Sequence, residues 1–271
     1  MWSKVSRLNE GQLLEFADNG FLVVPDVLAA GEVDALIGEA EKLYTTDSPG
    51  RTFESDGQTV RAVHGCHQTS GRYAGIVADA RLLVPARQIV GDDVYVHQSK
   101  INAKRAISGD VWPWHQDFTF WNRADGMPEP RVVNVAVLLD EATEHNGPLL
   151  FIPGSHRAES AETVFSGKAG EKPEQDSWRQ HLAAELEYTV SRETVELLSR
   201  EKGIVPALGG AGSLIFFDSR IVHGSGSNMT PYDRRMAIFT YNSVDNIPVE
   251  VADPRPEFLA SRDHAPLRVP R

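Results

Sequence analysis

The chain changes character at Gly91, and this change limits what it can fold into. Before Gly91, apolar residues recur mostly at the three- and four-residue spacing of amphipathic helices. After it, short runs rich in β-branched and aromatic residues alternate with Gly, Pro and Asn turn signals. Because helices precede a series of short strands, the sequence predicts a mainly β protein, a β-sandwich or jelly roll with flanking helices. The predicted strands after Gly91 are 93–102, 132–140, 149–152, 213–218, 221–223 and 236–242.

The part of the chain before Gly91 is expected to support the β core from one side. Asn9 can cap a first helix and Gly20 can end it, while Pro25 stops a short buried strand that follows. The predicted elements of this part are helices at 9–20, 31–45 and 72–91 and a strand at 21–24.

Two segments lack a regular pattern. Residues 46–70 contain Asp, Ser, Pro, Gly and Thr without a steady period, so we expect a loop there. Residues 157–200 are polar and charged, and we expect them to form an insertion between two groups of strands. No break in composition requires a second domain. The expected organisation is therefore one domain over residues 1–271, with its helical part at about 1–91.

Composition excludes several classes of protein. The 271 residues include 27 Lys and Arg and 38 Asp and Glu, a formal net charge of −11. Such a chain lacks the clustered cations that bind nucleic acid or anionic membranes, so we expect neither partner. The single cysteine, Cys66, excludes an intrachain disulfide and a zinc site of several thiolates. No apolar run is long enough to span a membrane, and the N-terminus lacks the apolar stretch of a signal peptide, so we expect a cytoplasmic protein. None of these features indicates an oligomeric state.

The densest chemical signal is the run from Trp112 to Trp121, which contains His115 and Asp117. In an extended segment these two side chains lie on the same face, because side chains alternate along a strand. A third candidate ligand, His223, follows much later in another β-like segment. Two His and one Asp form the facial arrangement typical of non-haem Fe(II), which leaves positions open for a co-substrate and O2. Zinc can take the same three ligands, so these residues alone do not decide the metal.

Two further residues indicate what binds beside the metal. Arg234 lies on the β-like segment after His223, and a guanidinium can hold a carboxylate through two parallel hydrogen bonds. Ser225, two residues after His223, can add a hydroxyl. A metal with open positions beside this pair suits a dicarboxylate that also chelates iron. The same residues also fit a zinc hydrolase and a jelly-roll protein that binds metal or co-substrate without catalysis.

A second group of possible ligands is weaker. The run His64-Gly65-Cys66-His67 is similar to a metal clip, but no second pair accompanies it. We therefore expect these residues to line a surface or a pocket.

The motifs together resemble the phytanoyl-CoA hydroxylase-like family of Fe(II)/2-oxoglutarate-dependent oxygenases, over most of the chain. Two branches that act on small molecules are similar to it. The segments that resemble ectoine hydroxylases are 94–102, 125–128 and 145–149. Those that resemble bacterial free L-proline trans-4-hydroxylases are more numerous: 43–44, 47–49, 51–52, 59–67, 101–104, 109–117, 132–141, 218–226 and 256–260.

The resemblance implies a double-stranded β-helix in which His115, Asp117 and His223 hold Fe(II), with 2-oxoglutarate and O2 as co-substrates. It implies that 2-oxoglutarate chelates the iron and that its distal carboxylate meets Arg234 and Ser225. No catalytic side chain beyond the metal ligands is expected, because the oxidant at the metal does the chemistry. The other residues implied to contact co-substrate or substrate are Asn102, Gln98, Trp121 and Phe217.

The resemblance also implies the reaction, which is hydroxylation of free L-proline to trans-4-hydroxy-L-proline with release of succinate and CO2. Arg61 and Lys100 are candidates to bind the carboxylate of this small substrate, which needs a cation. Three positions depart from the ectoine branch, since Lys100 replaces its Arg, Met236 its Asn and Ile238 its Phe. These changes disfavour ectoine, although ectoine, pipecolate or another small cyclic amino acid remains the alternative substrate.

Overall fold

The structure is a computed structural model that describes residues 7–157, 186 and 188–270. Its helices are α1 (Glu10–Asn19), α2 (Ala30–Thr45), α3 (Cys66–Thr69), α4 (Gly71–Val77), α5 (Ala80–Val90), α6 (Asp117–Asp125), the short 3-10 helix η1 (Ser155–Arg157) and α7 (Arg192–Lys202). Its strands are β1 (Phe21–Val24), β2 (Arg51–Phe53), β3 (Val60–His64), β4 (Val94–Lys104), β5 (Trp112–His115), β6 (Val132–Leu138), β7 (Leu150–Phe151), β8 (Val205–Pro206), β9 (Leu214–Asp218), β10 (His223–Ser225) and β11 (Arg234–Ser243).

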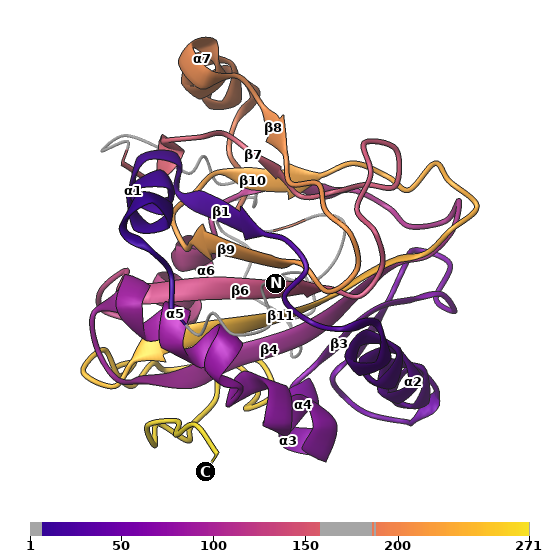
Figure 1. Ribbon diagram of the computed structural model, residues 1–271, viewed down its shortest axis with the longest axis horizontal. Helices are drawn as coiled ribbons and strands as arrows, with labels where there is room; N and C mark the ends of the chain where they lie inside the picture. The colour runs from indigo at the N-terminus through magenta and orange to yellow at the C-terminus, as the bar shows by residue number, and fades with distance from the viewer. Residues whose placement is uncertain (1–6, 158–185, 187, 271) are drawn as a thin grey trace.

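The strands form two antiparallel sheets (Figure 1). The major sheet has the strand order β1-β9-β6-β11-β4-β3-β2, and the minor sheet has the order β5-β10-β7-β8. Aromatic side chains join the two sheets, since the ring of Phe151 on β7 lies 4.6 Å from that of Phe21 and 5.4 Å from that of Phe217. Two antiparallel sheets around a shared core are the architecture of a jelly roll, so the predicted fold class is confirmed.

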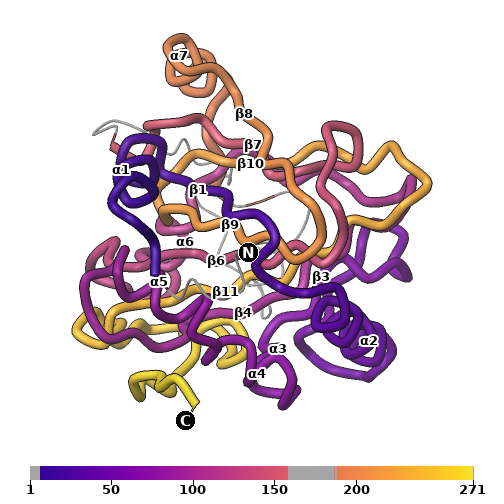
Figure 2. The backbone as a smooth tube through the Cα atoms, in the orientation of Figure 1, coloured from indigo at the N-terminus to yellow at the C-terminus, as the bar shows by residue number. Residues whose placement is uncertain are grey.

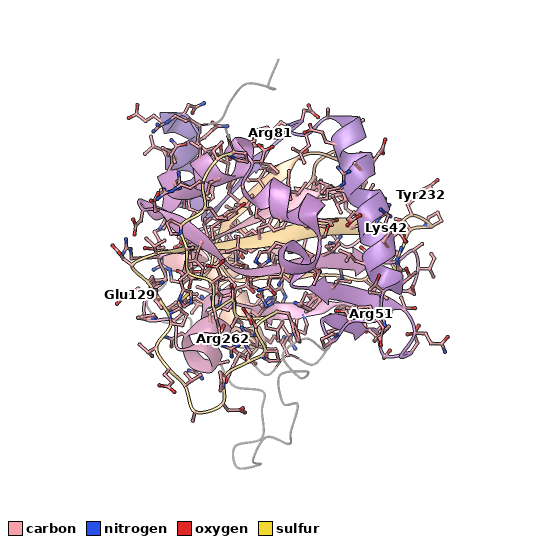
Figure 3. The ribbon with its side chains drawn as sticks, turned by 90° about the horizontal axis from the view of Figure 1, so that it is seen from below. Lys42, Arg51, Arg81, Glu129, Tyr232 and Arg262 are labelled. Atoms are coloured by element: carbon pink, nitrogen blue, oxygen red, sulfur yellow. The ribbon has the colours of Figure 1, made fainter. Side chains whose placement is uncertain are left out.

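Helices cover the face of the major sheet that points away from the minor sheet. Tyr73 on α4 packs against Phe239 on β11, with 6.5 Å between the ring centroids, and its hydroxyl donates to the carbonyl of Leu36 on α2. Figure 3 shows α2, marked by Lys42 on its solvent side, lying across this face. These helices therefore pack on the sheet, and the expected organisation as one domain stays a prediction.

The first helix and strand follow their predicted signals closely. Asn9 caps α1 by accepting a hydrogen bond from the backbone N–H of Gln12, and the side-chain oxygen of Gln12 accepts one from the backbone N–H of Asn9. Gly20 ends the helix with a φ of 82°, a left-handed conformation that favours glycine. Beta-strand β1 then begins at Phe21 and pairs with β9.

The prediction of a loop at 46–70 is wrong. This segment contains β2, β3 and α3, and β3 pairs with β4 so that Ala62 faces Asn102 and His64 faces Lys100. Beta-strand β3 carries polar residues and no strict alternation, so its pairing with a distant strand was not visible as a local pattern. The predicted helix at 72–91 is two helices, because Asp79 interrupts it and caps α5 through the N–H of Arg81.

The predicted insertion at 157–200 lies partly outside the described residues, which omit 158–185 and 187. Its later part contains α7, and the backbone N–H of Val190 donates to the carbonyl of Trp114 on β5. The segment thus returns along the edge of the minor sheet, next to β5.

Three loops meet at the end of the sandwich where β4 ends and β11 begins (Figure 2). The backbone N–H of Asn228 donates to the carbonyl of Gly109, and that of Met229 donates to the carbonyl of His145. These contacts close one end of the space between the sheets. Within the described residues, no helix has the length and apolar character needed to cross a membrane.

Candidate active site

His115, Asp117 and His223 converge between the two sheets. One possible ligand atom from each lies within 4.8 Å of the others, and all three side chains are buried. The two histidines meet because β5 and β10 are neighbours in the minor sheet and their register places His223 directly opposite His115. Nε2 of His115 lies 3.5 Å from one carboxylate oxygen of Asp117, and Nε2 of His223 lies 3.7 Å from the other.

Asp117 reaches this position in a different way from the one expected. Gln116 is extended, with φ −122° and ψ 124°, so alternation holds as far as Gln116. Asp117 itself is the first residue of α6, and the expectation that it lies on a strand is wrong. The first helical turn still directs its carboxylate toward the histidines.

Both imidazoles are oriented by backbone carbonyls. Nδ1 of His115 lies 2.7 Å from the carbonyl oxygen of Pro113, and Nδ1 of His223 lies 3.0 Å from that of Ile221. A carbonyl oxygen only accepts, so each Nδ1 carries the proton and each Nε2 presents a lone pair. These are the tautomers that a metal ion needs.

The carboxylate of Asp117 is held by a short chain of polar side chains. Asn134 on β6 donates its amide N–H to Asp117 over 2.8 Å, and Thr240 on β11 donates to the amide oxygen of Asn134 over 2.8 Å. Sequence reasoning did not assign Asn134 to the site. The available signal was a single polar residue inside the apolar run of β6.

Burial and nearby charges keep Asp117 and His223 in the protonation states that bind a metal. Burial alone would raise the pKa of Asp117, but the Lys100 ammonium and the nearby imidazoles outweigh it and hold that pKa below its ordinary range. Burial, followed by the proximity of His115, lowers the pKa of His223 to about 3. At neutral pH Asp117 is therefore ionised and His223 is neutral.

Arg234, at the start of β11, is a buried cation with unused hydrogen-bonding capacity. Its side chain is 1% exposed, and its Nη2 donates to the carbonyl of Gly147 over 2.6 Å. Nε and Nη1 of Arg234 have no hydrogen-bond partner among the described residues, and neither has the hydroxyl of Ser225. Burial lowers the pKa of Arg234 to about 9, which leaves it charged at neutral pH. This combination of donors fits a carboxylate.

The histidines, Asp117 and Arg234 line one shared cavity. Several other residues predicted to bind co-substrate or substrate also line it, namely Lys100, Asn102, Phe217 and Ser225. Four further lining residues were not predicted to contact a ligand, namely Trp112, Leu149, Gly224 and Ile238. Gly224 allows β10 to approach β5, because a Cβ there would lie 2.9 Å from the carbonyl oxygen of Trp112.

Three predicted contact residues do not line this cavity. Nε1 of Trp121 donates to Oε1 of Gln98 over 3.4 Å, and Trp121 packs in an apolar cluster on α6. Arg61 forms an ion pair of 2.7 Å with Glu54 and stacks on the ring of Trp112 at 3.8 Å. Glu54 already compensates the charge of Arg61, and it is the ring of Trp112, not Arg61, that lines the cavity. A ligand contact by these three residues stays a prediction.

Comparisons with known proteins indicate the family to which this chain belongs. The profile of the family named phytanoyl-CoA dioxygenase (PhyH) matches residues 16–236. An L-proline trans-4-hydroxylase from Streptomyces griseoviridis is 38% identical, with 94% of this chain and 93% of that protein covered. An ectoine dioxygenase from Sphingopyxis alaskensis is also 38% identical, with 100% of this chain and 89% of that protein covered. The crystal structure of EctD from S. alaskensis with 2-oxoglutarate and 5-hydroxyectoine superposes with a TM-score of 0.83 at 34% identity, covering 100% of this chain and 90% of that one.

The chain therefore belongs to the phytanoyl-CoA dioxygenase family. It is a 2-oxoglutarate-dependent dioxygenase whose cofactors are Fe(II), 2-oxoglutarate and O2, as the sequence predicted. Proline and ectoine enzymes are equally similar to it in overall identity, so overall similarity does not choose between their substrates.

Proposed function

We propose that this enzyme hydroxylates free L-proline to trans-4-hydroxy-L-proline, with release of succinate and CO2. The observation that carries the proposal is the shared cavity, in which three buried ligand atoms lie with a buried guanidinium that has two unpartnered N–H groups. His115, Asp117 and His223 would hold Fe(II). Bound Fe(II), with 2-oxoglutarate and O2, supplies an oxidant for an unactivated C–H bond, which no side chain can attack.

The protein's own residues would orient the two organic molecules. Arg234 and Ser225 offer the distal carboxylate of 2-oxoglutarate three donors that nothing else in the described chain uses. Ser225 lies two residues after His223 on β10, and both side chains line the same cavity. Asn102 lines the same cavity, and its amide oxygen also lacks a partner among the described residues.

The residues around Lys100 in the cavity support a small amino acid as the substrate. Lys100 lines the cavity, and no carboxylate of the described residues lies within ion-pair distance of its ammonium. Its ammonium lies 6.0 Å from the centroid of the Trp112 ring, and a substrate carboxylate would give it an anionic partner. Met236 and Ile238 follow Arg234 at a spacing of two on β11, so these apolar side chains face the same side as Arg234. Both positions carry other residues in the ectoine branch, which supports a different substrate.

The test is turnover on a panel of substrates. The protein is loaded with Fe(II) and 2-oxoglutarate without O2 and is then exposed to O2 with L-proline, D-proline, L-pipecolate or ectoine. We expect succinate to form in step with a product one oxygen heavier, and to form fastest with L-proline. Asp117→Asn serves as the control of low turnover, because it removes one anionic ligand.

Other outcomes of the same panel favour the alternatives. Fastest turnover of ectoine or pipecolate would replace proline as the substrate. Hydrolysis that needs neither O2 nor 2-oxoglutarate would indicate a zinc enzyme on the same three ligands. Binding of Fe(II) and 2-oxoglutarate without succinate formation on any substrate would indicate a protein that only binds them.

One further expectation concerns location. Cys66 is buried and free, and a chain with one cysteine and no disulfide suits a reducing compartment. We propose that the enzyme acts in the cytoplasm.

A further inference from the structure

His64 has a buried imidazole whose two ring nitrogens, Nδ1 and Nε2, lack hydrogen-bond partners among the described residues. The residue is 2% exposed. Leaving buried polar atoms unpaired costs free energy, so such groups normally have a partner in the functional state. The nearby His67 differs, since its Nδ1 lies 2.6 Å from the hydroxyl of Ser99.

The register of the major sheet places His64 beside Lys100, which lines the cavity, while His64 itself lies behind the lining residues. In the β3–β4 pair His64 lies directly opposite Lys100, and directly opposite residues of an antiparallel pair project from the same face. Lys100 lines the cavity and acts on the pKa of both Asp117 and His64, so its ammonium is close to each of them. His64 on β3 thus lies next to Lys100 on β4. Beta-strand β4 separates β3 from β11, the strand that carries Arg234.

His64 is also neutral. Burial, with the positive charges of Lys100 and Arg255, lowers its pKa to about 3. A neutral imidazole has one nitrogen with a lone pair, which can accept a hydrogen bond from an ammonium group. A cation and a neutral acceptor side by side match the two charged ends of an amino-acid zwitterion.

We propose that His64 is a substrate-binding residue, which accepts a hydrogen bond from the ring ammonium of the amino acid while Lys100 binds its carboxylate. This inference rests on the proposed function and names how the substrate is recognised. With the charged end of the amino acid held at Lys100 and His64, the carbon atoms on the far side of its ring face the metal ligands. Recognition of the nitrogen would separate proline from cyclic acids that lack an amine.

The test compares two ligands that differ only at the ring nitrogen, L-proline and cyclopentanecarboxylate. Their affinities for the protein loaded with Fe(II) and 2-oxoglutarate are measured by calorimetry without O2. We expect the wild-type protein to bind L-proline more tightly. His64→Leu should weaken L-proline binding by at least about tenfold and leave cyclopentanecarboxylate and 2-oxoglutarate binding unchanged, because it removes only the acceptor for the ammonium.

Matched variants separate binding from structural effects. Lys100→Met should weaken both ring ligands, since both carry a carboxylate, and His67→Leu should change neither. His64→Gln should retain part of the preference for L-proline, because its amide oxygen also accepts. The stability of the ligand-free protein should not fall in His64→Leu, because the change removes unpaired buried atoms.

Two results would overturn the inference. If His64→Leu weakens both ring ligands equally, or lowers only the unfolding midpoint, His64 has a structural role. If the wild-type protein binds and converts ectoine but not L-proline, the proposed function fails and this inference fails with it. The two cases differ, because the first leaves turnover of L-proline by the wild-type enzyme intact.

Discussion

A guanidinium with one hydrogen-bond acceptor is costly to bury, and Arg234 is such a group. It lies directly opposite Lys104 in the β11–β4 pair, and each of these side chains is 1% exposed. Burial and the charge of Arg234 lower the pKa of Lys104 to about 6, which limits the repulsion between them. Lys104 donates to the backbone carbonyls of Asp110 and Gly226, whereas Nε and Nη1 of Arg234 have no partner among the described residues and leave a place for an anion. The distal carboxylate of 2-oxoglutarate has the required charge.

Arg234→Met should therefore weaken 2-oxoglutarate binding without destabilising the ligand-free protein. We expect a loss of about 2–4 kcal/mol in binding free energy, the scale for breaking a buried charge pair, or about 30- to 700-fold in affinity. Calorimetric titration of the Fe(II)-loaded protein without O2 measures it. Arg235→Met is the matched control, since Arg235 forms ion pairs with Asp140 and Glu41 instead. Equal affinities in Arg234→Met and wild type would contradict the clamp.

At the scale of elements, α6 links the site to the end of the chain. Asp117 is its first residue and Asp125 its last. Nε2 of His97 on β4 lies 2.9 Å from Asp125, and Arg255 donates two hydrogen bonds to the same carboxylate over 2.7 and 2.6 Å. The C-terminal segment, marked by Arg262 in Figure 3, is thereby attached to α6. This attachment restricts the position from which Asp117 meets the histidines.

The Asp125 contacts predict a dependence of stability on acid pH. Burial alone would raise the pKa of Asp125, but Arg255 and His97 outweigh it and lower that pKa from 3.8 to about 2. A lowered carboxyl pKa contributes stability that is complete above about 3.8 and is lost as pH falls toward 2. The wild-type protein should lose unfolding free energy between pH 5 and pH 2, as measured by urea titration. In Asp125→Asn this loss should be smaller by about 2 kcal/mol.

The control for this effect is Asp253→Asn, which changes an exposed carboxylate on the same C-terminal segment. It should leave the acid dependence as in the wild-type protein. An Asp125→Asn protein that loses stability with the wild-type slope would show that Asp125 contributes nothing to that dependence.

Local signals predicted some elements and not others. Helix α1 was predictable because Asn9 and Gly20 carry its start and its end within the sequence itself. Beta-strand β3 was not, since it is defined by its pairing with β4, and α6 was not, since the run that begins it reads as extended. The same contrast holds in the site. The order of His115, Asp117 and His223 indicated three side chains that do converge, whereas the hydrogen bond from Asn134 to Asp117 and the place of His64 opposite Lys100 depend on contacts between distant segments.

In the whole molecule, the candidate site joins the two sheets. His115 and His223 belong to the minor sheet and Asp117 to α6, while Lys100, Asn102 and Arg234 line the cavity from the major sheet (Figure 1). A metal ion would connect the minor sheet with α6. A co-substrate bound to that metal and to Arg234 would also connect the minor sheet with the major one. The two ligands are therefore expected to stabilise the fold in separate steps.

Fe(II) alone should raise the free energy of unfolding, and 2-oxoglutarate added to the Fe(II)-loaded protein should raise it again. A ligand present at 100 times its dissociation constant contributes about 2.7 kcal/mol if it binds only the folded state. Chemical denaturation without O2 measures both steps. His223→Ala should lose both, because the metal anchors the co-substrate, whereas Arg234→Met should keep the first and lose most of the second. If 2-oxoglutarate stabilises His223→Ala as strongly as the wild-type protein, then it binds without the metal, and the chelate proposed between the two sheets does not form.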